Sequence, residues 1–280
     1  MWYVLGCIVT NVLLLLWLRV LRLPLISLIT LNYFVCVGMI SYIDAPSLYA
    51  FQRLPAGGKI LLLTLGILFI TVFALTGRAT KEIGVGLSGM LAKLSLILPI
   101  SYAALILGEP ISHTQGIGIL LGLFSIVIVH LPYLQEGRKS LKNFQIGIWL
   151  WLGNGIIDIL FKEGARTWQG LSTLHIPFFI MLVAGVIGII FHIVKDKLRD
   201  FFSLRAAAGA FLLGSTNLLS IFFYLKGLNI LPAAQFFMWN NLGIVLISGV
   251  VGIAFFRERF RWEVGLGYGI GGLSLLLLSL

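Results

Sequence analysis

The sequence predicts an all-α integral membrane protein in which ten transmembrane helices form two inverted five-helix repeats. Three observations lead to this prediction: the composition, the spacing of the apolar runs and an internal similarity between the two halves. Of the 280 residues, 59% are hydrophobic and only 11% are charged, and the mean hydropathy is +1.05. These values lie well outside the balance of a soluble domain, so we expect the membrane part to be the whole protein.

Apolar runs long enough to cross a bilayer follow one another along the whole chain. A helix needs about 20 apolar residues to span the hydrocarbon core. The runs are separated where Pro, Gly and charge coincide, as in "RLPAGGK", "TGRATKE" and "QEGRKSLKN", which are typical loop signals. We predict helices over residues 1–18, 24–43, 60–77, 83–107, 114–134, 145–162, 173–194, 204–225, 230–255 and 263–280.

The two halves of the chain resemble each other. A shift of 149 residues places "GEPISHTQGIGILLGLFS" over "RERFRWEVGLGYGIGGLS" and aligns Glu109 with Glu258. The same shift aligns Gly118, Gly122 and Ser125 with Gly267, Gly271 and Ser274. We therefore predict a first repeat over residues 1–134, an inter-repeat loop over 135–144 and a second repeat over 145–280. An odd number of helices per repeat inverts the second copy, which is a plan that secondary transporters use.

The stretch "KLSLILPISYAALILGEPISHTQGIGILLGLFSIVIV" resembles the C-terminal end of an EamA-type repeat of the drug/metabolite transporter superfamily. It carries a proline inside the helix at Pro99, a Gly-Glu turn at Gly108 and Glu109, and a closing helix that contains glycines. The second copy departs from the pattern at Ser248, where proline is expected, and at Arg257, which replaces the turn glycine. The resemblance implies a ten-helix carrier that works by alternating access. The superfamily moves amino acids, nucleotide sugars, drugs and other metabolites, so the substrate stays open; we expect export of a small amphipathic metabolite such as an amino acid.

Two ionisable residues are the main candidates for the polar core of a transport site. Lys93 lies about ten residues inside its predicted helix, and Asp158 lies in the segment "LGNGIIDILFKEGAR". A charge at the bilayer centre costs about 2.5–3.5 kcal/mol on insertion scales, so such groups normally face a partner or a wet cavity. We predict that Lys93 and Asp158 face the same cavity, as a pair that the substrate breaks or as two ends of a site for a zwitterion or anion. A desolvated carboxyl binds protons readily, so Asp158 is also the candidate proton carrier.

Polar neighbours of these two residues are secondary candidates. Asn154 and Lys162 lie four residues either side of Asp158, on the same helix face. In a purely structural interpretation, Lys162 snorkels to the interface and Asp158 pairs with it. Asn240 and Asn241 lie on the repeat partner of the Lys93 helix and point about 100° apart, so at most one looks straight into a cavity. Trp239 either faces that cavity or packs against protein or lipid. Asn11, Asn32 and Asn217 also lie in predicted helices, where asparagine commonly joins helices by hydrogen bonds.

The aligned glycines and glutamates have structural roles in this interpretation. The glycines form small-xxx-small faces at matching positions of the fifth and tenth helices, so each helix should pack closely on a neighbour. That neighbour lies either within the chain or in a second copy, which would form a homodimer. Glu109 and Glu258 lie in the turns before these helices, where a carboxylate can cap a helix N-terminus.

Other classes of function are less well supported. The positive residues sit in short clusters between apolar runs, which argues for the lipid bilayer as partner and against nucleic acid. The four histidines are scattered and no nucleophile, metal or cofactor motif is present, so we expect no cofactor and no enzymatic activity. A lipid-modifying enzyme using Asp158, Lys162 and Glu163 is the alternative, and it would change the mass of a lipid. A membrane assembly subunit is a further alternative, and in it the face with Lys93 and Asp158 would be sealed by protein.

The charges also predict an orientation. Fourteen Lys and Arg residues lie in the odd-numbered loops and five in the even-numbered loops, which places the odd loops in the cytoplasm and both termini outside. Ten-helix members of the superfamily usually have both termini in the cytoplasm, so the two arguments disagree. Either way we expect a multi-pass protein of a cell membrane, and of the bacterial inner membrane in particular.

Overall fold

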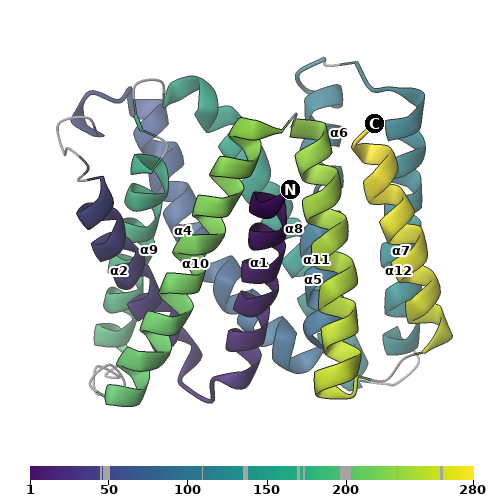
Figure 1. The fold of residues 1–280 in the computed structure, drawn as a ribbon, viewed down its shortest axis with the longest axis horizontal. Coiled ribbons are helices and arrows are strands. Elements are labelled where there is room, and N and C mark those ends of the chain that lie inside the picture. Colours follow the sequence, from purple (N-terminus) through teal and green to yellow (C-terminus); the bar gives the residue numbers. More distant parts are fainter. Residues whose placement is uncertain are drawn as a thin grey trace. The chain divides into compact units, whose positions relative to one another are not determined.

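The computed structural model describes residues 1–44, 46, 51–108, 110–134, 138–168, 171–172, 174–195, 203–231, 233–258 and 261–280. Throughout this described part the regular structure is α-helical, without a β-strand (Figure 1). The helices are α1 (Trp2–Val20), α2 (Leu25–Ile43), α4 (Ala56–Glu82), α5 (Val85–Leu94), α6 (Ile97–Leu105), α7 (His113–Leu134), α8 (Arg138–Thr167), α9 (His175–Val194), α10 (Leu204–Ile230), α11 (Ala233–Phe256) and α12 (Trp262–Leu278).

Each of the ten apolar runs in the sequence lies on a helix, and the fourth run is divided between α5 and α6. Within the described residues, eight helices are long and apolar enough to cross a membrane, when α5 and α6 are taken together as Val85–Leu105. Shorter apolar stretches lie in α7 (His113–Val129) and α12 (Trp262–Leu278). The connection between the first two helices is short, because α1 ends at Val20 and α2 begins at Leu25.

Helix α8 begins earlier than the apolar pattern predicts. The predicted inter-repeat loop over 135–144 is helical from Arg138 onward, where α8 begins. An ion pair joins this extension to the end of α4, because Lys142 Nζ lies 3.1 Å from Glu82 Oε2. Arg78 Nε donates to the same carboxylate over 2.6 Å. Charged residues can continue a helix beyond the apolar span, so hydropathy alone placed this helix start too late.

Contacts divide the chain into two compact units, which we describe separately. Unit 1 contains Met1–Arg19, Leu75–Ile156 and Ser220–Leu280, and unit 2 contains Val20–Ala74 and Ile157–Leu219. Each unit takes segments from both sides of residues 135–144. The units are therefore defined by packing and do not coincide with the two predicted repeats.

In unit 2, α2 and α9 lie side by side (Figure 1) and their polar side chains are hydrogen-bonded. Ser27 Oγ lies 2.8 Å from His192 Nε2, and His192 Nδ1 lies 2.7 Å from the Gly188 carbonyl oxygen. The His192 side chain is buried, so these bonds satisfy polar atoms that water does not reach. We interpret this histidine as a structural contact between the two helices.

Where α2 ends and α9 begins, the carboxylate of Asp44 contacts Ser172 and His175. The Ser172 hydroxyl donates to Asp44 Oδ2 over 2.6 Å, and His175 Nε2 lies 3.4 Å from Asp44 Oδ1. The Ser172 hydrogen bond, with His175 beside it, holds the pKa of the Asp44 carboxyl below its usual value. The Asp44 carboxyl therefore ionises more readily than an ordinary aspartate.

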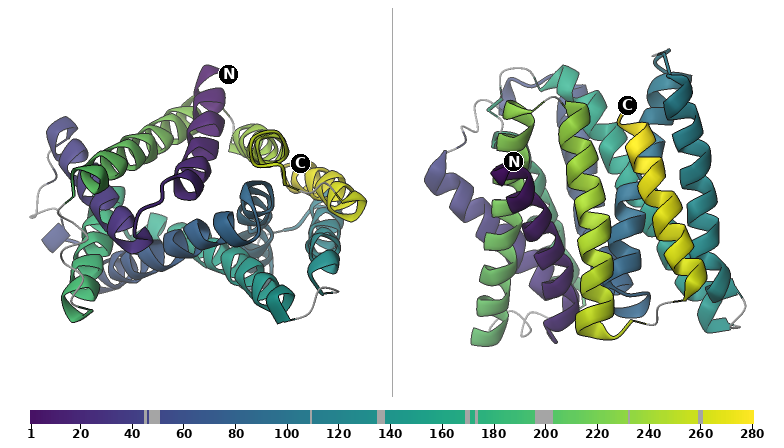
Figure 2. Two further views of the ribbon diagram at one scale, coloured as in Figure 1. Left: turned by 90° about the horizontal axis from the view of Figure 1, so that it is seen from below. Right: turned by 45° about the vertical axis from the view of Figure 1, so that its right-hand side comes forward.

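In unit 1, α7 and α12 pack side by side along their length (Figures 1 and 2). The Ser125 hydroxyl of α7 donates to the Gly267 carbonyl oxygen over 2.8 Å. In return, the Ser274 hydroxyl of α12 donates to the Gly118 carbonyl oxygen over 2.7 Å. The two donors are 149 residues apart, and so are the two acceptors.

The glycines of α7 and α12 permit this close approach. A Cβ on Gly118 would lie 3.1 Å from the Leu278 backbone nitrogen, and a Cβ on Gly271 would lie 2.9 Å from Ser125 Oγ. The neighbour that these small-residue faces require is therefore within the same chain. A homodimer is not needed to cover them and stays a prediction.

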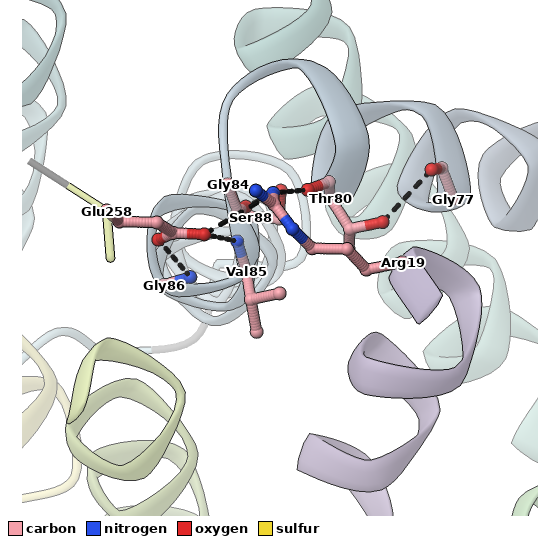
Figure 3. Close-up of polar contacts among 8 residues, drawn as sticks. All are labelled: Arg19, Gly77, Thr80, Gly84, Val85, Gly86, Ser88 and Glu258. Atoms are coloured by element: carbon pink, nitrogen blue, oxygen red, sulfur yellow. Dashed lines mark hydrogen bonds and ion pairs between the residues drawn. The ribbon is translucent and has the colours of Figure 1, made fainter. Parts of the chain in front are cut away.

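Glu258 caps a helix, but a different helix from the one that follows it. It lies in the turn before α12, yet its carboxylate accepts hydrogen bonds from the backbone N–H groups of Val85 and Gly86 at the start of α5 (Figure 3). Its aligned partner, Glu109, lies outside the described residues. Local sequence could not show this, because the capped helix begins more than a hundred residues earlier in the chain.

Candidate functional site

The helix that carries Lys93 is interrupted in the middle of its membrane span. The predicted single helix over 83–107 is wrong in this respect, because α5 ends at Leu94 and α6 begins at Ile97. Pro99 has no N–H to donate to the Ser95 carbonyl, which would be its partner in a regular α-helix. Instead, Leu98 N–H donates to the Ser95 oxygen over 2.9 Å, a tighter three-residue turn. Pro99 is the sequence signal that marks this break.

A tryptophan of α8 binds the carbonyl that the break leaves open. Trp151 Nε1 donates to the Leu94 carbonyl oxygen over 3.1 Å. Nearby, a Cβ on Gly155 would lie 2.7 Å from Leu98 Cβ, so this part of α8 runs directly against the break. Inside a bilayer an unsatisfied carbonyl is costly. The hydrogen bond from Trp151 therefore stabilises the broken helix, and the Lys93 side chain takes no part in this hydrogen bond.

We expect Trp151→Phe to destabilise the protein without preventing it from folding. The substitution keeps an aromatic ring but removes the N–H that binds the Leu94 oxygen. Leaving a buried polar group unsatisfied costs about 1–3 kcal/mol. The midpoint of thermal unfolding in detergent should fall accordingly. Trp149→Phe, at an exposed position two residues earlier on the same helix, is the matched control and should unfold like the wild type.

Lys93 occupies the last turn of α5, where the helix dipole favours a positive charge. Its side chain is half-buried. The ammonium lies within electrostatic range of the Cys7 thiol of α1. The negative C-terminal end of α5 thus partly compensates the charge of Lys93. This compensation is a physical reason why a lysine can lie within a membrane span.

Helix α1 brings further polar groups to the same region of unit 1. Ile8 of α1 packs against Gly243 of α11, where a Cβ would collide with Ile8 Cδ1. Leu15 of α1 packs against Gly89 of α5, where a Cβ would lie 3.2 Å from Leu15 Cδ1. Asn11 lies between Ile8 and Leu15 on this face of α1. Its Nδ2 donates over 2.8 Å to the Ser220 hydroxyl of α10. Asn11 therefore places a polar side chain, bound to α10, close to where α1 meets α5 and α11.

Two asparagines of α11 lie near the same end of α5. On α5, Gly86 lies against Gly249 of α11 and Gly89 lies against Ser248. The two helices therefore run antiparallel, and Asn240 and Asn241 lie towards the Leu94 end of α5. Asn240 is 2% exposed and Asn241 is 6% exposed. Asn240 Nδ2 lies 3.5 Å from Asn241 Oδ1, whereas Asn240 Oδ1 is buried without a hydrogen-bond partner. A buried acceptor of this kind calls for a donor.

The other predicted residues are distributed over both units. Asn154 in unit 1 is half-buried and its Nδ2 donates to the Leu150 carbonyl of its own helix over 2.8 Å. Trp239 is 49% exposed, which fits a lipid-facing side chain. Asp158 is exposed and Lys162 is half-buried, and both belong to unit 2. The common cavity of Lys93 and Asp158 therefore stays a prediction.

The candidate site in unit 1 thus consists of Lys93 with Cys7 beside it, together with the polar residues that α1, α10 and α11 bring to this unit: Asn11, Ser220, Asn240 and Asn241. Sequence reasoning did not find Cys7, Ser220 or Trp151, because each binds through a contact between helices that are far apart in the chain. Among the described residues, no group of three or more His, Cys, Asp and Glu side chains is arranged to hold a metal ion.

The apolar spans and the polar groups held among them define a multi-pass membrane protein. No family model matches the chain. The sequence is 32% identical over 209 residues to an uncharacterized protein of Haemophilus influenzae, and the match covers 70% of this chain and 67% of that protein. The chain belongs to the same family as that protein.

Proposed function

We propose that this protein is a secondary carrier of the EamA type, in the drug/metabolite transporter superfamily, which exports a small metabolite such as an amino acid across the bacterial inner membrane. The observation that carries the proposal is Lys93, a half-buried lysine at the break of a membrane-spanning helix. Transporters commonly build their sites at interrupted helices near the bilayer midplane, where helix ends and unpaired backbone groups meet the substrate.

The pairing of α7 with α12 supports two related five-helix repeats. Ser125 binds the Gly267 oxygen, and Ser274 binds the Gly118 oxygen. The shift of 149 residues turns Ser125 into Ser274 and Gly118 into Gly267, so the two hydrogen bonds are equivalent in the two repeats. Such a reciprocal pair is expected where two copies pack about a pseudo-two-fold axis. If α7 and α12 also cross the bilayer, the chain has ten crossings, with α5 and α6 forming one of them.

The site chemistry favours a solute that carries a carboxylate. Lys93 supplies a positive charge, and Asn240 Oδ1 supplies a buried acceptor for an N–H group. Asp158 is exposed although it lies in an apolar span, which favours a water-filled path around it because an ionised group is costly against lipid. A carboxylate in such a path can accept and release the proton that couples transport.

The test is solute flux into proteoliposomes, with and without an imposed pH gradient. A pooled, labelled set of amino acids, sugars and nucleosides should reveal accumulation that the gradient drives. Asp158→Asn should abolish the gradient-driven part, whereas Glu163→Gln, which removes another carboxylate of α8, should keep it. If the wild type moves no solute, or if Asp158→Asn accumulates solute like the wild type, the proposal of a proton-coupled carrier is wrong. A change in the mass of a lipid would instead identify an enzyme.

A further inference from the structure

We infer that Glu258 and Arg19 form a latch that holds the first turn of α5 in a closed position and opens during each transport cycle. The inference rests on the proposed function, because it concerns the movement of the helix that carries Lys93. All the groups involved belong to unit 1, and Figure 3 shows them together.

Glu258 supplies the cap that α5 does not supply for itself. The residue before α5 is Gly84, which has no side chain and adopts a φ of +103°. The Glu258 carboxylate takes its place: Oε1 lies 2.7 Å from the Val85 nitrogen and Oε2 lies 3.3 Å from the Gly86 nitrogen. A carboxylate at a helix N-terminus satisfies open N–H groups and complements the helix dipole.

Two glycines leave the space that this carboxylate occupies. A Cβ on Gly84 would lie 2.6 Å from Glu258 Cδ, and a Cβ on Gly252 would collide with Glu258 Oε2. The Glu258 backbone N–H donates to the Gly252 carbonyl oxygen over 3.1 Å, which turns the chain back after α11. The local backbone therefore brings the carboxylate to α5 and leaves room for it there.

Arg19 joins two further helix ends to the same carboxylate. Its Nη1 lies 3.4 Å from Glu258 Oε1 and donates to the Thr80 carbonyl oxygen near the end of α4. Its guanidinium carbon lies 4.6 Å from the centre of the Phe256 ring. Arg19 is in the last turn of α1. The ends of α1, α4 and α11 thus meet the start of α5 at one ion pair.

This junction is suited to opening and closing. The side chains of Arg19 and Glu258 are 22% and 21% exposed, so water can solvate both charges when they separate. A pair of this kind contributes little net stability, unlike a fully buried pair that resists separation. The 10 residues of α5 span about 15 Å at the usual helical rise. Release of the first turn would therefore free one end of the short helix whose other end carries Lys93.

Thiol labelling tests the latch without needing a known solute. The two native cysteines, Cys7 and Cys36, are fully buried. Labelling of the wild-type chain therefore measures the background rate. The reporter is Ser88→Cys, at a buried position in the first turn of α5 where the hydroxyl donates to the Gly84 oxygen over 2.6 Å. In proteoliposomes, a membrane-impermeant maleimide should label this variant slowly. Adding Glu258→Gln should speed labelling about tenfold, because the charge that caps the helix start is lost. Arg19→Gln should also speed labelling, by a smaller factor, because the Glu258 carboxylate then loses its ion pair.

Glu82→Gln is the matched control. Glu82 is also a carboxylate paired with basic residues in unit 1, but it binds Arg78 and Lys142 and not α5. Its loss should leave the labelling rate of Ser88→Cys unchanged. If neither Glu258→Gln nor Arg19→Gln speeds labelling, or if Glu82→Gln speeds it equally, the latch is refuted.

A second measurement asks whether the latch opens during transport. With a transported solute and a pH gradient present, labelling of Ser88→Cys should rise at least about twofold over the resting rate, as expected for a population shift towards the open state. An unchanged rate during demonstrated transport would show that the latch does not take part in the cycle. If no solute is transported, the proposed function fails, and the labelling of the Glu258 and Arg19 variants still decides whether the latch exists.

Discussion

Lys93→Met should reduce solute flux by about 10–100-fold while leaving the protein folded. A hydrogen bond to a charged group contributes about 1.5–3 kcal/mol to binding, and each 1.4 kcal/mol corresponds to a factor of ten in affinity. Methionine has a similar length and no charge, so it fills the same space without binding a carboxylate. Initial rates of uptake over a range of solute concentrations would measure the effect, which we expect mainly as weaker apparent affinity.

The stability of this variant should move in the opposite direction from its activity. Placing a lysine deep in a membrane span costs about 2.5–3.5 kcal/mol on insertion scales, and methionine removes that cost. Lys93→Met should therefore unfold at the same temperature as the wild type or at a higher one. Lys226→Met is the control, because Lys226 is an exposed lysine of unit 1 that lies over the Phe222 ring. If Lys93→Met transports like this control, Lys93 does not bind the solute.

Gly122→Leu should strongly destabilise the protein, whereas Gly116→Leu on the same helix should not. A Cβ on Gly122 would collide with Ile97 and would lie 2.6 Å from Ser274 Oγ, but a Cβ on Gly116 meets no atom within 4 Å. Overpacking costs about 1–3 kcal/mol, and Gly122→Leu would also displace the hydroxyl that binds the Gly118 oxygen.

Thermal unfolding in detergent would compare these two variants directly, with the loss of monodisperse protein as the readout. Replacing glycine in a helix interior by leucine normally favours the helix by about 0.5–1 kcal/mol. Gly116→Leu should therefore match or exceed the wild type. Equal loss of stability in the two variants would show that the contact between α7 and α12 does not depend on the absence of a side chain at Gly122.

Helix positions could be predicted from the sequence because hydropathy and turn residues report on them directly. The break between α5 and α6 was not predicted, although Pro99 lies at the right place, because a proline in a membrane helix is often accommodated without interruption. The aligned position on α11 is Ser248, and α11 is continuous from Ala233 to Phe256. The helix with proline at this position is broken and the helix with serine is continuous, so we attribute the break to Pro99.

The candidate site could be predicted only in part. Lys93 was found because a charge within an apolar run is conspicuous in any sequence. Trp151 and Ser220 were not found, since their residue types are common in membrane helices and their roles depend on partners far away in the chain. The same reason explains why Glu258 was expected to cap a local helix and binds α5 instead. Asp158 stays a prediction, because it belongs to the other unit.

The pairing of α7 with α12 also has a consequence for how the chain is made. The Ser125 hydroxyl and the Gly118 carbonyl find their partners on α12, which reaches the membrane only after residues 135–261 have been synthesised. Until then, the glycine face of α7 is covered by lipid or by the insertion machinery, without the close contact that it is shaped for. Helix α12 therefore completes a contact surface formed early in synthesis, and chains that stop before α12 should be recognised and degraded as unfinished.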